Sequence, residues 1–555
     1  MSNSSRYLPI AAVAVFVAGC SLIGGTPVSA QAVTPQQGNI QGKIAQQTRE
    51  KLQERDAESR VKQQGPAVVT DPLNRRELPA PGGPTVLLKS VAFEPGSAFL
   101  TRAELDGIAG KYQGKRVDFS QISELVRDVN DLYAEKGIVT AAAILPPQQL
   151  SDGTLEVRLV EGQVGKVALV GEHQTKNEFI FDRVTLAKGT TVDVPTASKD
   201  IQRFNAVNRA QLRMLLQPGA SFGYTDLLLG ITEPPKHELQ FYLDNEGVAS
   251  TGRGQLSTLY RRYGLLGVDD TLLAYVATSE GSTAATLRYE FPINTHGTRL
   301  AASVTASKVN VVHGPTKVLN ITGDSKSANL TLSHPLFVNE NWTVLGTAAA
   351  FYGTSSSKSA TVPLVDSKTT KLAPGVTLSY SGDKAAMTTQ VQGVFAKATD
   401  NIAGSTRDIF LLAGSFSGQY YLENGFSLVG TGAWQHTSAK LVPGNLLFQI
   451  GGPTTVRGYP SDGVAGDSGY YASMEVHKQF NMPHGVPLDG YLFTDFGTVY
   501  STFPKHTNLV SAGVGANYNL NDRVKLSLSV AAPLKQSVTN QSDYVVSAMM
   551  TFNAF

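Results

Sequence analysis

A two-residue period of apolar and polar side chains runs from about residue 237 to the C-terminus, and no amphipathic helix interrupts it. In 510–520, apolar residues at even positions alternate with serine, glycine and asparagine; in 524–530 they alternate with lysine and serine. This period is typical of β-strands whose two faces meet different surroundings. A soluble sheet of this size needs helices over its apolar face, whereas a lipid-facing barrel with a polar lumen needs no cover. We therefore predict a transmembrane antiparallel β-barrel over residues 237–555.

The expected number of strands and the orientation of the barrel follow from the lengths of the strands and of their connections. Sixteen membrane strands leave roughly 20 residues for each strand and its connection, and fourteen or eighteen strands also fit. The last five strands are predicted at 470–480, 491–500, 510–520, 524–534 and 543–555. The connection 521–523 is tight, whereas 502–508 and 535–542 are longer. Because short turns face the periplasm, we expect the C-terminus there and the connection before Tyr470 on the extracellular side.

The composition fits this fold and excludes other classes. Charged residues make up 17% of the 555 residues, against about 25% in typical soluble proteins. The 47 basic and 45 acidic residues nearly cancel, which argues against a nucleic-acid partner. The single cysteine, the scattered histidines and the lack of a phosphate-binding or nucleophile motif predict no enzyme, no catalytic residue, no metal site and no cofactor.

The first 30 residues have the form of an export signal. Arg6 precedes the apolar segment 7–19, and Val28-Ser29-Ala30 forms a small-residue cleavage site. The sequence Val17-Ala18-Gly19-Cys20 also resembles a lipobox, in which Cys20 would carry the lipid. Both processing routes stay open, and both take the protein out of the bacterial cytoplasm.

Residues 31–64 and 65–84 lack the features of a packed domain. The first segment favours helix but is polar on nearly every face, with few apolar residues (Ile40, Ile44 and Leu52). Such a helix cannot bury a stripe in an ordinary core, so it is either unfolded in isolation or held in a wet place. The second segment contains five prolines and the pair Gly82-Gly83, and is predicted to be a linker.

Residues 85–163 and 164–236 contain one order of elements twice: strand, helix, helix, strand, strand. The clearest helix is 118–136, where Asp118 and Gln121 form a capping box and Gly137 ends the helix. Its apolar residues share one face: Ile122, Leu125, Val126, Val129, Leu132 and Tyr133. An internal repeat of this kind predicts two related αβ domains.

Several motifs indicate a known family. Val456, Arg457, Gly458 and Tyr459 resemble the Val-Arg-Gly-Tyr/Phe motif of the barrel superfamily that inserts or translocates proteins at the outer membrane. Phe493, Asp495 and Gly497 resemble its partner motif, Phe-x-Asp-x-Gly, on a later strand. Further short sequences resemble the ends of the periplasmic domains of two-partner secretion transporters: 145–150, 153–155, 160–162, 217–219 and 227–229. The chain thus resembles the haemolysin secretion/activation transporters, and its repeats resemble polypeptide-transport-associated (POTRA) domains.

The resemblance implies a complete architecture and a function. It implies a sixteen-stranded barrel in the bacterial outer membrane, two βααββ POTRA domains in the periplasm, and an N-terminal helix, 31–64, that plugs the pore. It implies export of a large, mostly β-helical adhesin or haemolysin without nucleotide hydrolysis. The POTRA domains would capture the client, by strand addition or in a groove. Further implied partners are outer-membrane lipid and, during biogenesis, the barrel-assembly machinery.

Three other functions are alternatives to export. An insertase of the same superfamily usually has more POTRA domains, and a passive porin needs neither POTRA domains nor the two motifs. A lipid-anchored periplasmic interaction protein would require 237–555 to be soluble. One departure concerns the last strand: Phe555 falls on the opposite face from Tyr544, Val546, Ala548, Met550 and Phe552. A very large exoprotein encoded by the neighbouring gene would identify the client.

Arg457 and Asp495 are the candidate site residues with the most specific chemistry. If Leu492, Thr494 and Phe496 face lipid, then Phe493, Asp495 and Gly497 face the lumen, because a carboxylate in hydrocarbon is costly. We expect Asp495 to accept a bidentate bond from Arg457, with Gly458 permitting a close turn and Tyr459 packing beside it. The alternative is a solvated loop arginine and an unrelated wall aspartate. Lone acids such as Glu475 are expected to be solvated.

Overall fold

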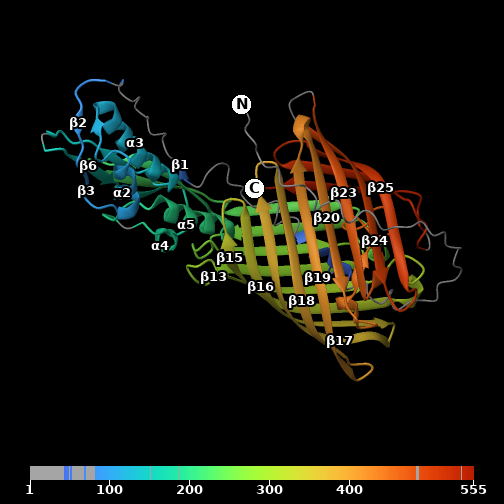
Figure 1. Cartoon of the computed structure of the whole chain (residues 1–555). Helices are drawn as coiled ribbons and strands as arrows, with labels where there is room; N and C mark the ends of the chain where they lie inside the picture. The colour runs from blue at the N-terminus through green and yellow to red at the C-terminus, as the bar shows by residue number, and fades with distance from the viewer. Residues whose placement is uncertain are drawn as a thin grey trace.

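The computed structural model describes residues 43, 44, 46–48, 51, 52, 68, 69, 80, 82–150, 152–186, 188–482, 487–538 and 541–555. The predicted signal segment, Cys20 and much of 31–84 lie outside these residues. Figure 1 shows a β-barrel with two small αβ units that extend in series from one end of it. Within the described ranges, no helix is both long and apolar enough to cross a membrane.

The barrel is one closed sheet of sixteen antiparallel strands, as predicted. Closure is made by the first and last strands, which pair from Gln240–Asn553 to Asp244–Met549. The strands in order are β10 (His237–Asp244), β11 (Gln255–Tyr263), β12 (Thr271–Thr278), β13 (Ser282–Pro292), β14 (Arg299–Asn310), β15 (Ile321–Val338), β16 (Trp342–Ser359), β17 (Val362–Ser381), β18 (Ala385–Asp400), β19 (Ser405–Tyr421), β20 (Phe426–His436), β23 (Ser468–Asn481), β24 (Pro487–Tyr500), β25 (His506–Asn519), β26 (Val524–Pro533) and β27 (Val545–Asn553).

The two faces of the barrel differ as the alternating sequence requires. Leu492 and Phe496 of β24 point outward and are 62% and 39% exposed. Asp495, which lies between them in the sequence, is 0% exposed. The lumen is a cavity of about 2690 Å³, and serine, threonine, asparagine and glutamine are frequent along its wall. An apolar outer face around a polar interior is the arrangement that a bilayer-spanning barrel needs.

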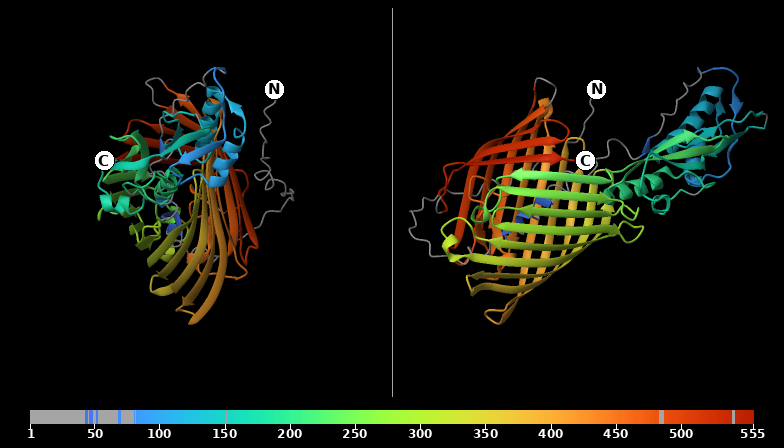
Figure 2. Two further views of the ribbon diagram at one scale, coloured as in Figure 1. Left: turned by 60° about the vertical axis from the view of Figure 1, so that its left-hand side comes forward. Right: turned by 180° about the vertical axis from the view of Figure 1, so that it is seen from behind.

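The αβ units and the C-terminus lie at the same end of the barrel. The second unit leads directly into β10, and Leu239 near the start of β10 exchanges backbone bonds with Ala554 and Phe555 at the C-terminus. The tight connection 521–523 lies at that end too, because it follows β25 and precedes β26. The right-hand view of Figure 2 shows the units extending beyond this end. The arrangement agrees with the predicted orientation.

The first αβ unit is a three-stranded sheet covered by two helices. Strands β3 (Ser90–Glu94) and β5 (Ala141–Ile144) flank β6 (Thr154–Glu161), and β2 (Val86–Leu87) pairs separately with β4 (Arg116–Val117). Helices α2 (Arg102–Gly110) and α3 (Phe119–Glu135) complete the unit. The predicted capping box of α3 is present, and Leu125 and Val129 on its inner face are fully buried. The predicted strand 86–91 is divided because Leu88 bonds to Lys115 between β2 and β3.

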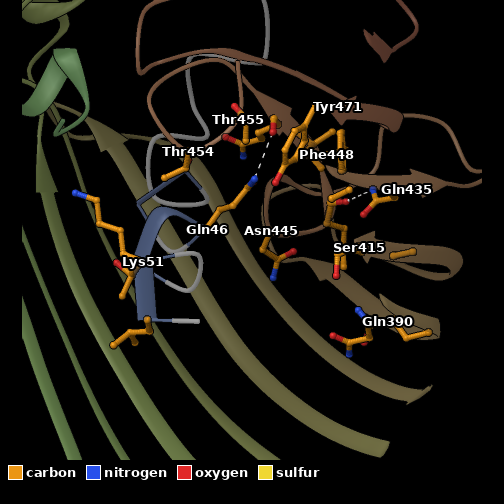
Figure 3. A pocket seen from close by; sticks show the side chains of 18 of the residues that line it. Gln46, Lys51, Gln390, Ser415, Gln435, Asn445, Phe448, Thr454, Thr455 and Tyr471 are labelled. Carbon is orange, nitrogen blue, oxygen red and sulfur yellow. Dashed lines mark hydrogen bonds between the residues drawn. The ribbon is translucent and has the colours of Figure 1, made fainter. Parts of the chain in front are cut away.

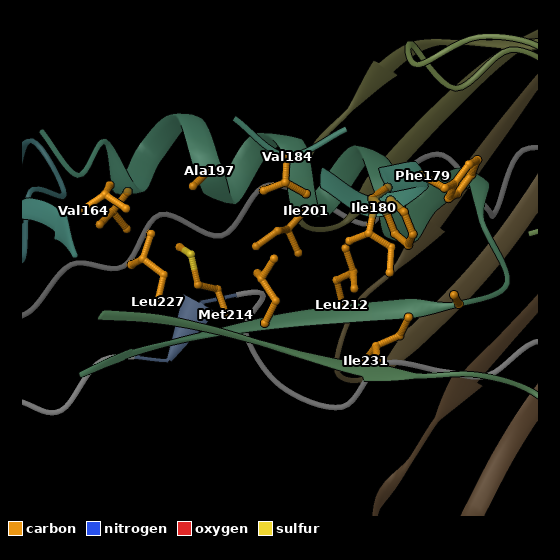
Figure 4. Close-up of a cluster of buried hydrophobic side chains, with 14 of the residues drawn as sticks. Val164, Phe179, Ile180, Val184, Ala197, Ile201, Leu212, Met214, Leu227 and Ile231 are labelled. Atoms are coloured by element: carbon orange, nitrogen blue, oxygen red, sulfur yellow. The ribbon is translucent and has the colours of Figure 1, made fainter. Parts of the chain in front are cut away.

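The second unit repeats this order around its own core. Helices α4 (Asn177–Phe181) and α5 (Val194–Val207) cover a sheet of β7 (Gln163–Val170), β8 (Gln211–Pro218) and β9 (Tyr224–Thr232). Figure 4 shows side chains from both layers meeting between them, Ile201 from α5 and Met214 and Leu227 from the sheet among them.

A fourth strand of this sheet comes from the segment predicted to be only a linker. Strand β1 (Val68–Val69) pairs in parallel with β8, so that Val68 lies opposite Met214 and Val69 opposite Leu215. From one edge of the sheet to the other, the strand order is β1-β8-β9-β7. Proline cannot donate to a ladder, which limits how far such a strand can extend in a Pro-rich segment. The prediction of a plain linker was therefore incomplete at Val68 and Val69.

Candidate functional site

The candidate site lies on a loop that folds into the lumen. Residues 437–467 connect β20 to β23, and inside this loop β21 (Phe448–Ile450) pairs with β22 (Val464–Gly466) as a short hairpin. The hairpin presents residues 456–459 near its tip. Thr454, Thr455 and Arg457 line the lumen cavity, and Figure 3 shows Thr454 and Thr455 beside a helical segment that also lies in the lumen.

Arg457 and Asp495 form a bidentate ion pair. The Nε of Arg457 lies 2.8 Å from Oδ2 of Asp495, and its Nη2 lies 2.7 Å from Oδ1. The backbone N–H of Arg457 also donates to Oδ2, at 2.9 Å. Two parallel N–H···O bonds fix the plane of the guanidinium as well as its position. The third bond ties the main chain of the loop, and not only a flexible side chain, to the barrel wall.

The other contacts of Arg457 come from neighbouring wall strands. Its Nη1 lies 2.6 Å from Oε1 of Glu475, and its Nη2 donates to the Ser473 hydroxyl at 2.8 Å. The centre of the guanidinium lies 3.5 Å from the ring centroid of Phe493, a cation–π contact. The expectation that Glu475 is solvated was wrong, because Glu475 lies within reach of the loop arginine.

The register of two strands brings these wall residues together. Ser473 of β23 lies opposite Asp495 of β24, and Glu475 lies opposite Phe493. All four side chains face inward, since residues two apart along a strand share a face. Asp495 and Phe493 were recognisable as a motif in the sequence. Glu475 and Ser473 were not, because nothing local in the sequence states which residue of another strand lies opposite.

Glycines of the next strand make room for the aromatic side chains of β24. A Cβ built on Gly513 would lie 2.3 Å from Phe493, and one on Gly515 would lie 2.2 Å from Tyr491. Each ring therefore occupies the place where a side chain of β25 would stand. Phe493 lies between Gly513 and the guanidinium of Arg457. The glycines thus set how close the ring lies to the wall and, through it, how deep Arg457 reaches.

The remaining residues of the loop motif also have defined surroundings. Gly458 has φ of +85°, and a Cβ there would lie 3.2 Å from the backbone nitrogen of Pro533. Only glycine combines that conformation with so close an approach. The Tyr459 hydroxyl accepts from the Val510 amide at 3.1 Å and lies 2.8 Å from the Lys535 carbonyl. Val456 is fully buried with Phe448 and Leu509.

Gly497, the last residue of the wall motif, lies where the loop meets the barrel. A Cβ there would lie 3.0 Å from the Tyr470 carbonyl oxygen and 3.1 Å from Ile450 of the loop hairpin. A side chain at this position would therefore push β21 away from the wall. The three wall residues predicted from sequence thus contact the loop in three ways: by charge, by ring and by close approach.

A histidine extends the charged cluster along the wall. His477 Nε2 lies 2.8 Å from Oε2 of Glu475, and its Nδ1 lies 3.0 Å from Oδ2 of Asp489. The imidazole also stacks on Tyr491, with centroids 4.8 Å apart. Glu475 is therefore shared between the loop arginine and a wall histidine. Analysis of the sequence missed His477 because a single histidine on an alternating strand carries no signal of its partners.

The helical residues within 43–52 lie in the lumen and contact both the loop and the wall. The Lys43 ammonium donates to the Gly463 carbonyl at 3.4 Å, and the Gln46 amide donates to the Gln449 carbonyl at 3.3 Å. Figure 3 shows Gln46 and Lys51 directed to opposite sides of this segment. The helix is not polar on every face, since Ile44 is buried against the apolar side chains of Val248, Ala284 and Val309.

Lys51 anchors this helix to the wall at β10. Its ammonium lies 3.0 Å from Oδ2 of Asp244, 3.2 Å from Oε2 of Glu246 and 3.1 Å from Oε1 of Gln255. Lys51 is 5% exposed and Asp244 likewise 5%. A buried cation is stable only with such compensation, so the two carboxylates hold this end of the helix in place.

The part of the chain that the structure describes contains no candidate metal site. Among those residues, no group of three or more histidine, cysteine, aspartate or glutamate side chains is placed to hold a metal ion. Cys20, the candidate lipidation site, lies outside the described residues. The cluster around Arg457 can bind and position a loop, and its groups are already paired with one another.

Comparison with known proteins identifies the family. Residues 223–518 match the family model of the haemolysin secretion/activation protein ShlB/FhaC/HecB, and residues 86–162 match the ShlB-type POTRA domain. The heme/hemopexin transporter protein HuxB of Haemophilus influenzae strain 86-028NP is 23% identical over 480 residues, with 81% of this chain and 84% of HuxB covered. The outer membrane transporter CdiB of Dickeya dadantii is 24% identical over 414 residues, with 72% and 73% covered.

Solved structures share the fold. CdiB from Escherichia coli superposes with a TM-score of 0.69 at 18% identity, covering 95% of this chain and all of that one. CdiB from Acinetobacter baumannii superposes with a TM-score of 0.62 at 17% identity, also over 95% of this chain and all of that one. The barrel lies in the outer membrane and the POTRA region in the periplasm, and the pore exports an exoprotein by two-partner secretion. The chain belongs to the family of the haemolysin secretion/activation protein ShlB/FhaC/HecB.

Proposed function

We propose that this transporter exports a large, mostly β-helical adhesin or haemolysin in an extended form, through a lumen whose loop is positioned by Arg457. The bidentate pairing of Arg457 with Asp495, reinforced by the backbone bond, is the observation that carries the proposal. All groups in the cluster are bound to one another and none is oriented toward a reacting centre. The cluster therefore acts by position and not by chemistry, and no nucleotide is hydrolysed.

The segment 31–64 serves as the plug in this proposal. Its described residues occupy lumen space that a client must use, since they line the same cavity as the wall and the loop. Its main anchors are polar: Lys51 on Asp244 and Glu246, and Lys43 and Gln46 on loop carbonyls. Water can replace polar contacts of this kind at modest net cost, whereas a large apolar core would oppose release. A plug held mainly by such contacts can leave when the client arrives.

The two αβ units, 85–163 and 164–236, serve as the POTRA domains that capture the client. Strand addition to a sheet edge supplies affinity through main-chain bonds and tolerates varied sequence. The β8 edge of the second unit already binds an extended segment, since β1 occupies it over two residues. A client strand would compete with β1 for the same main-chain groups. The short length of β1 makes that exchange feasible.

Two further partners belong to the proposal. Outer-membrane lipid covers the apolar outer face, on which Phe241 of β10 and Phe552 of β27 stack across the closing seam, 6.4 Å between centroids. The barrel-assembly machinery inserts the barrel during biogenesis, for which the last strand is the expected signal. Phe555 follows the end of β27 and does not continue its outward face in the strand. We propose no catalytic residue, cofactor, metal or nucleic acid for this function.

The first prediction concerns the loop anchor. Arg457→Ala and Asp495→Ala should each impair export without removing the barrel, and the double variant should be little worse than either. Breaking a buried pair by removing one partner costs about 3–5 kcal/mol, and either single variant already breaks the bond that positions the loop, so the second removal adds little. The measurement is export of the cognate exoprotein in a double-mutant cycle, with barrel folding followed by heat-modifiable migration on gels.

A matched control is available on the outer wall. Lys397 and Asp408 form a pair at 3.8 Å whose side chains are 65% and 83% exposed. Such exposed pairs contribute little, so Lys397→Ala should leave export unchanged. Additive losses at Arg457 and Asp495 would show that the two residues act independently and would contradict the proposed anchor.

The second prediction concerns the plug. Deletion of residues 31–60 should leave the barrel folded and raise its conductance in planar bilayers. Lys51→Ala should raise the conductance or the open fraction in the same direction, because Asp244 and Glu246 lose the cation that they hold. Unchanged conductance in the deletion variant would place this segment outside the conducting path.

The third prediction concerns the second αβ unit. Deletion of residues 164–236 should abolish export while the barrel still reaches the outer membrane. The reason is that the β8 edge and its neighbouring surfaces go with the deleted unit, while the strands of the barrel remain. The measurement compares exoprotein in the medium with barrel in the outer-membrane fraction. Normal export by this variant would refute client capture by the second unit.

A further inference from the structure

A buried charged cluster lies at the junction between the second αβ unit and the barrel. Asp269 belongs to the turn between β11 and β12, and Arg299 is the first residue of β14. Their side chains are 0% and 5% exposed. Their hydrogen bonds go to residues 208–210, to Tyr263 and to Glu290, none of which belongs to the lumen loop or to the described part of the plug. The export function as proposed so far gives this cluster no role.

Arg299 joins three parts of the chain. Its Nη1 donates to Oδ2 of Asp269 at 3.0 Å and to the Asn208 side-chain oxygen at 2.9 Å. Its Nη2 donates to the Asp269 carbonyl at 2.8 Å, and its Nε donates to Glu290 of β13 at 2.9 Å. Asn208 directly follows α5. One guanidinium thus connects two barrel strands, a barrel turn and the end of a helix in the second unit.

Asp269 binds the two residues that directly precede β8. Its Oδ1 accepts from the backbone N–H of Ala210 at 2.9 Å and of Arg209 at 3.1 Å. The buried Tyr263 hydroxyl also donates to Oδ1, at 2.5 Å. Asp269 has φ of +59°, a left-handed conformation that aspartate tolerates better than most residues. In this conformation the Asp269 carboxylate points toward the residues that lead into β8.

Other contacts hold the same junction. The Lys176 amide donates to the Gly267 carbonyl at 2.9 Å, and the Arg183 guanidinium donates to the Asn294 carbonyl at 2.8 Å. These contacts limit separation of the unit from the barrel. Asp269 and Arg299 bind the residues between the end of α5 and the start of β8, and α5 also packs against β15. Their charged bonds thus help to set how that edge is oriented.

We infer that Arg299 and Asp269 form a clamp that aligns the β8 edge with the pore, so that an extended client strand bound there is already directed at the lumen. The inference rests on the proposed capture of the client by strand addition. In this role both are positioning residues. They contact the chain that presents the edge, and the client itself contacts the edge.

The path of the chain's own N-terminal segment supports this role. Val68 and Val69 run parallel to β8, so the N-terminal end of β1 faces the same way as the start of β8, which the clamp holds at the barrel. Lys51 and Leu52, earlier in the chain, lie in the lumen. One polypeptide therefore occupies both the β8 edge and the lumen. A client strand that replaces β1 in the same direction has the same path open to it.

The clamp is tested by the distance between the second unit and the barrel. Spin labels on Lys199→Cys, exposed on α5, and Asp522→Cys, exposed in the turn after β25, report it in the full-length protein in lipid. Cys20→Ser in every labelled variant removes the one native cysteine of the sequence. Arg299→Gln should broaden and shift the distance distribution and lower export strongly, while heat-modifiable migration of the barrel stays normal. Arg299→Lys should give a distance change and an export loss between those of the parent and of Arg299→Gln, because lysine keeps the charge and lacks the planar set of guanidinium donors.

Arg288→Gln is the matched control. Arg288 lies on β13, pairs with the same Glu290 at 2.5 Å and does not contact Asp269. It should leave both the distance distribution and export as in the parent protein. If Arg299→Gln also left the distances unchanged, Arg299 would not orient the unit and the inference would be wrong. Altered distances with normal export would equally overturn it.

The outcome is separable from failure of client capture itself. Asn208→Ala removes one bond of the clamp without burying an unpaired charge, and should give a smaller shift in distance and a smaller loss of export. Normal export after deletion of 164–236 would refute capture, whatever the distances in the Arg299 variants. Normal distances in Arg299→Gln and Asn208→Ala, with export still dependent on 164–236, would refute only the clamp.

Discussion

The hydrocarbon of the bilayer requires every backbone N–H and C=O of a spanning segment to be bonded within the protein, and the rest of this structure follows from that requirement. A sheet satisfies it only by closing, which β10 and β27 do here. Closure of sixteen strands encloses a lumen too wide for wall side chains to fill. The loop 437–467 and the helical residues near Lys51 occupy that space, and both are bound to the wall through charges.

Two kinds of stabilisation are found in the molecule. One holds the parts that keep their shape, and the other holds the parts that can move. Each αβ unit is built around an apolar core, with Leu125 in the first and Ile201 in the second. Inside the barrel, the loop and the plug combine small apolar clusters with charged and polar bonds, among them Arg457 on Asp495 and Lys51 on Asp244. The charged and polar bonds specify one geometry through direction and distance, and water can take their place when they open. A transporter needs both kinds of stabilisation, because the barrel wall must stay folded while the plug leaves the lumen.

Much of this fold was predictable because its signals are local. The period of two identified the barrel strands, and the costly burial of a carboxylate in lipid correctly turned Asp495 inward. The contacts that sequence analysis missed depend on register or on distant segments. Glu475 reaches Arg457 because of the pairing of β23 with β24, and Asp269 meets Arg299 across two hairpins. Val68 and Val69 form a strand only because β8 offers an edge.

The central claim is that Arg457 holds the lumen loop against the barrel wall. Hydrogen–deuterium exchange of the backbone amides in 448–466 tests it most directly, in the full-length protein in lipid, with Arg457→Ala compared to the parent and to Lys397→Ala. The account predicts faster exchange across the loop tip only in Arg457→Ala, because the Arg457 amide and guanidinium both bond to Asp495. Equal protection in all three proteins would contradict the claim and would show that other contacts hold the loop.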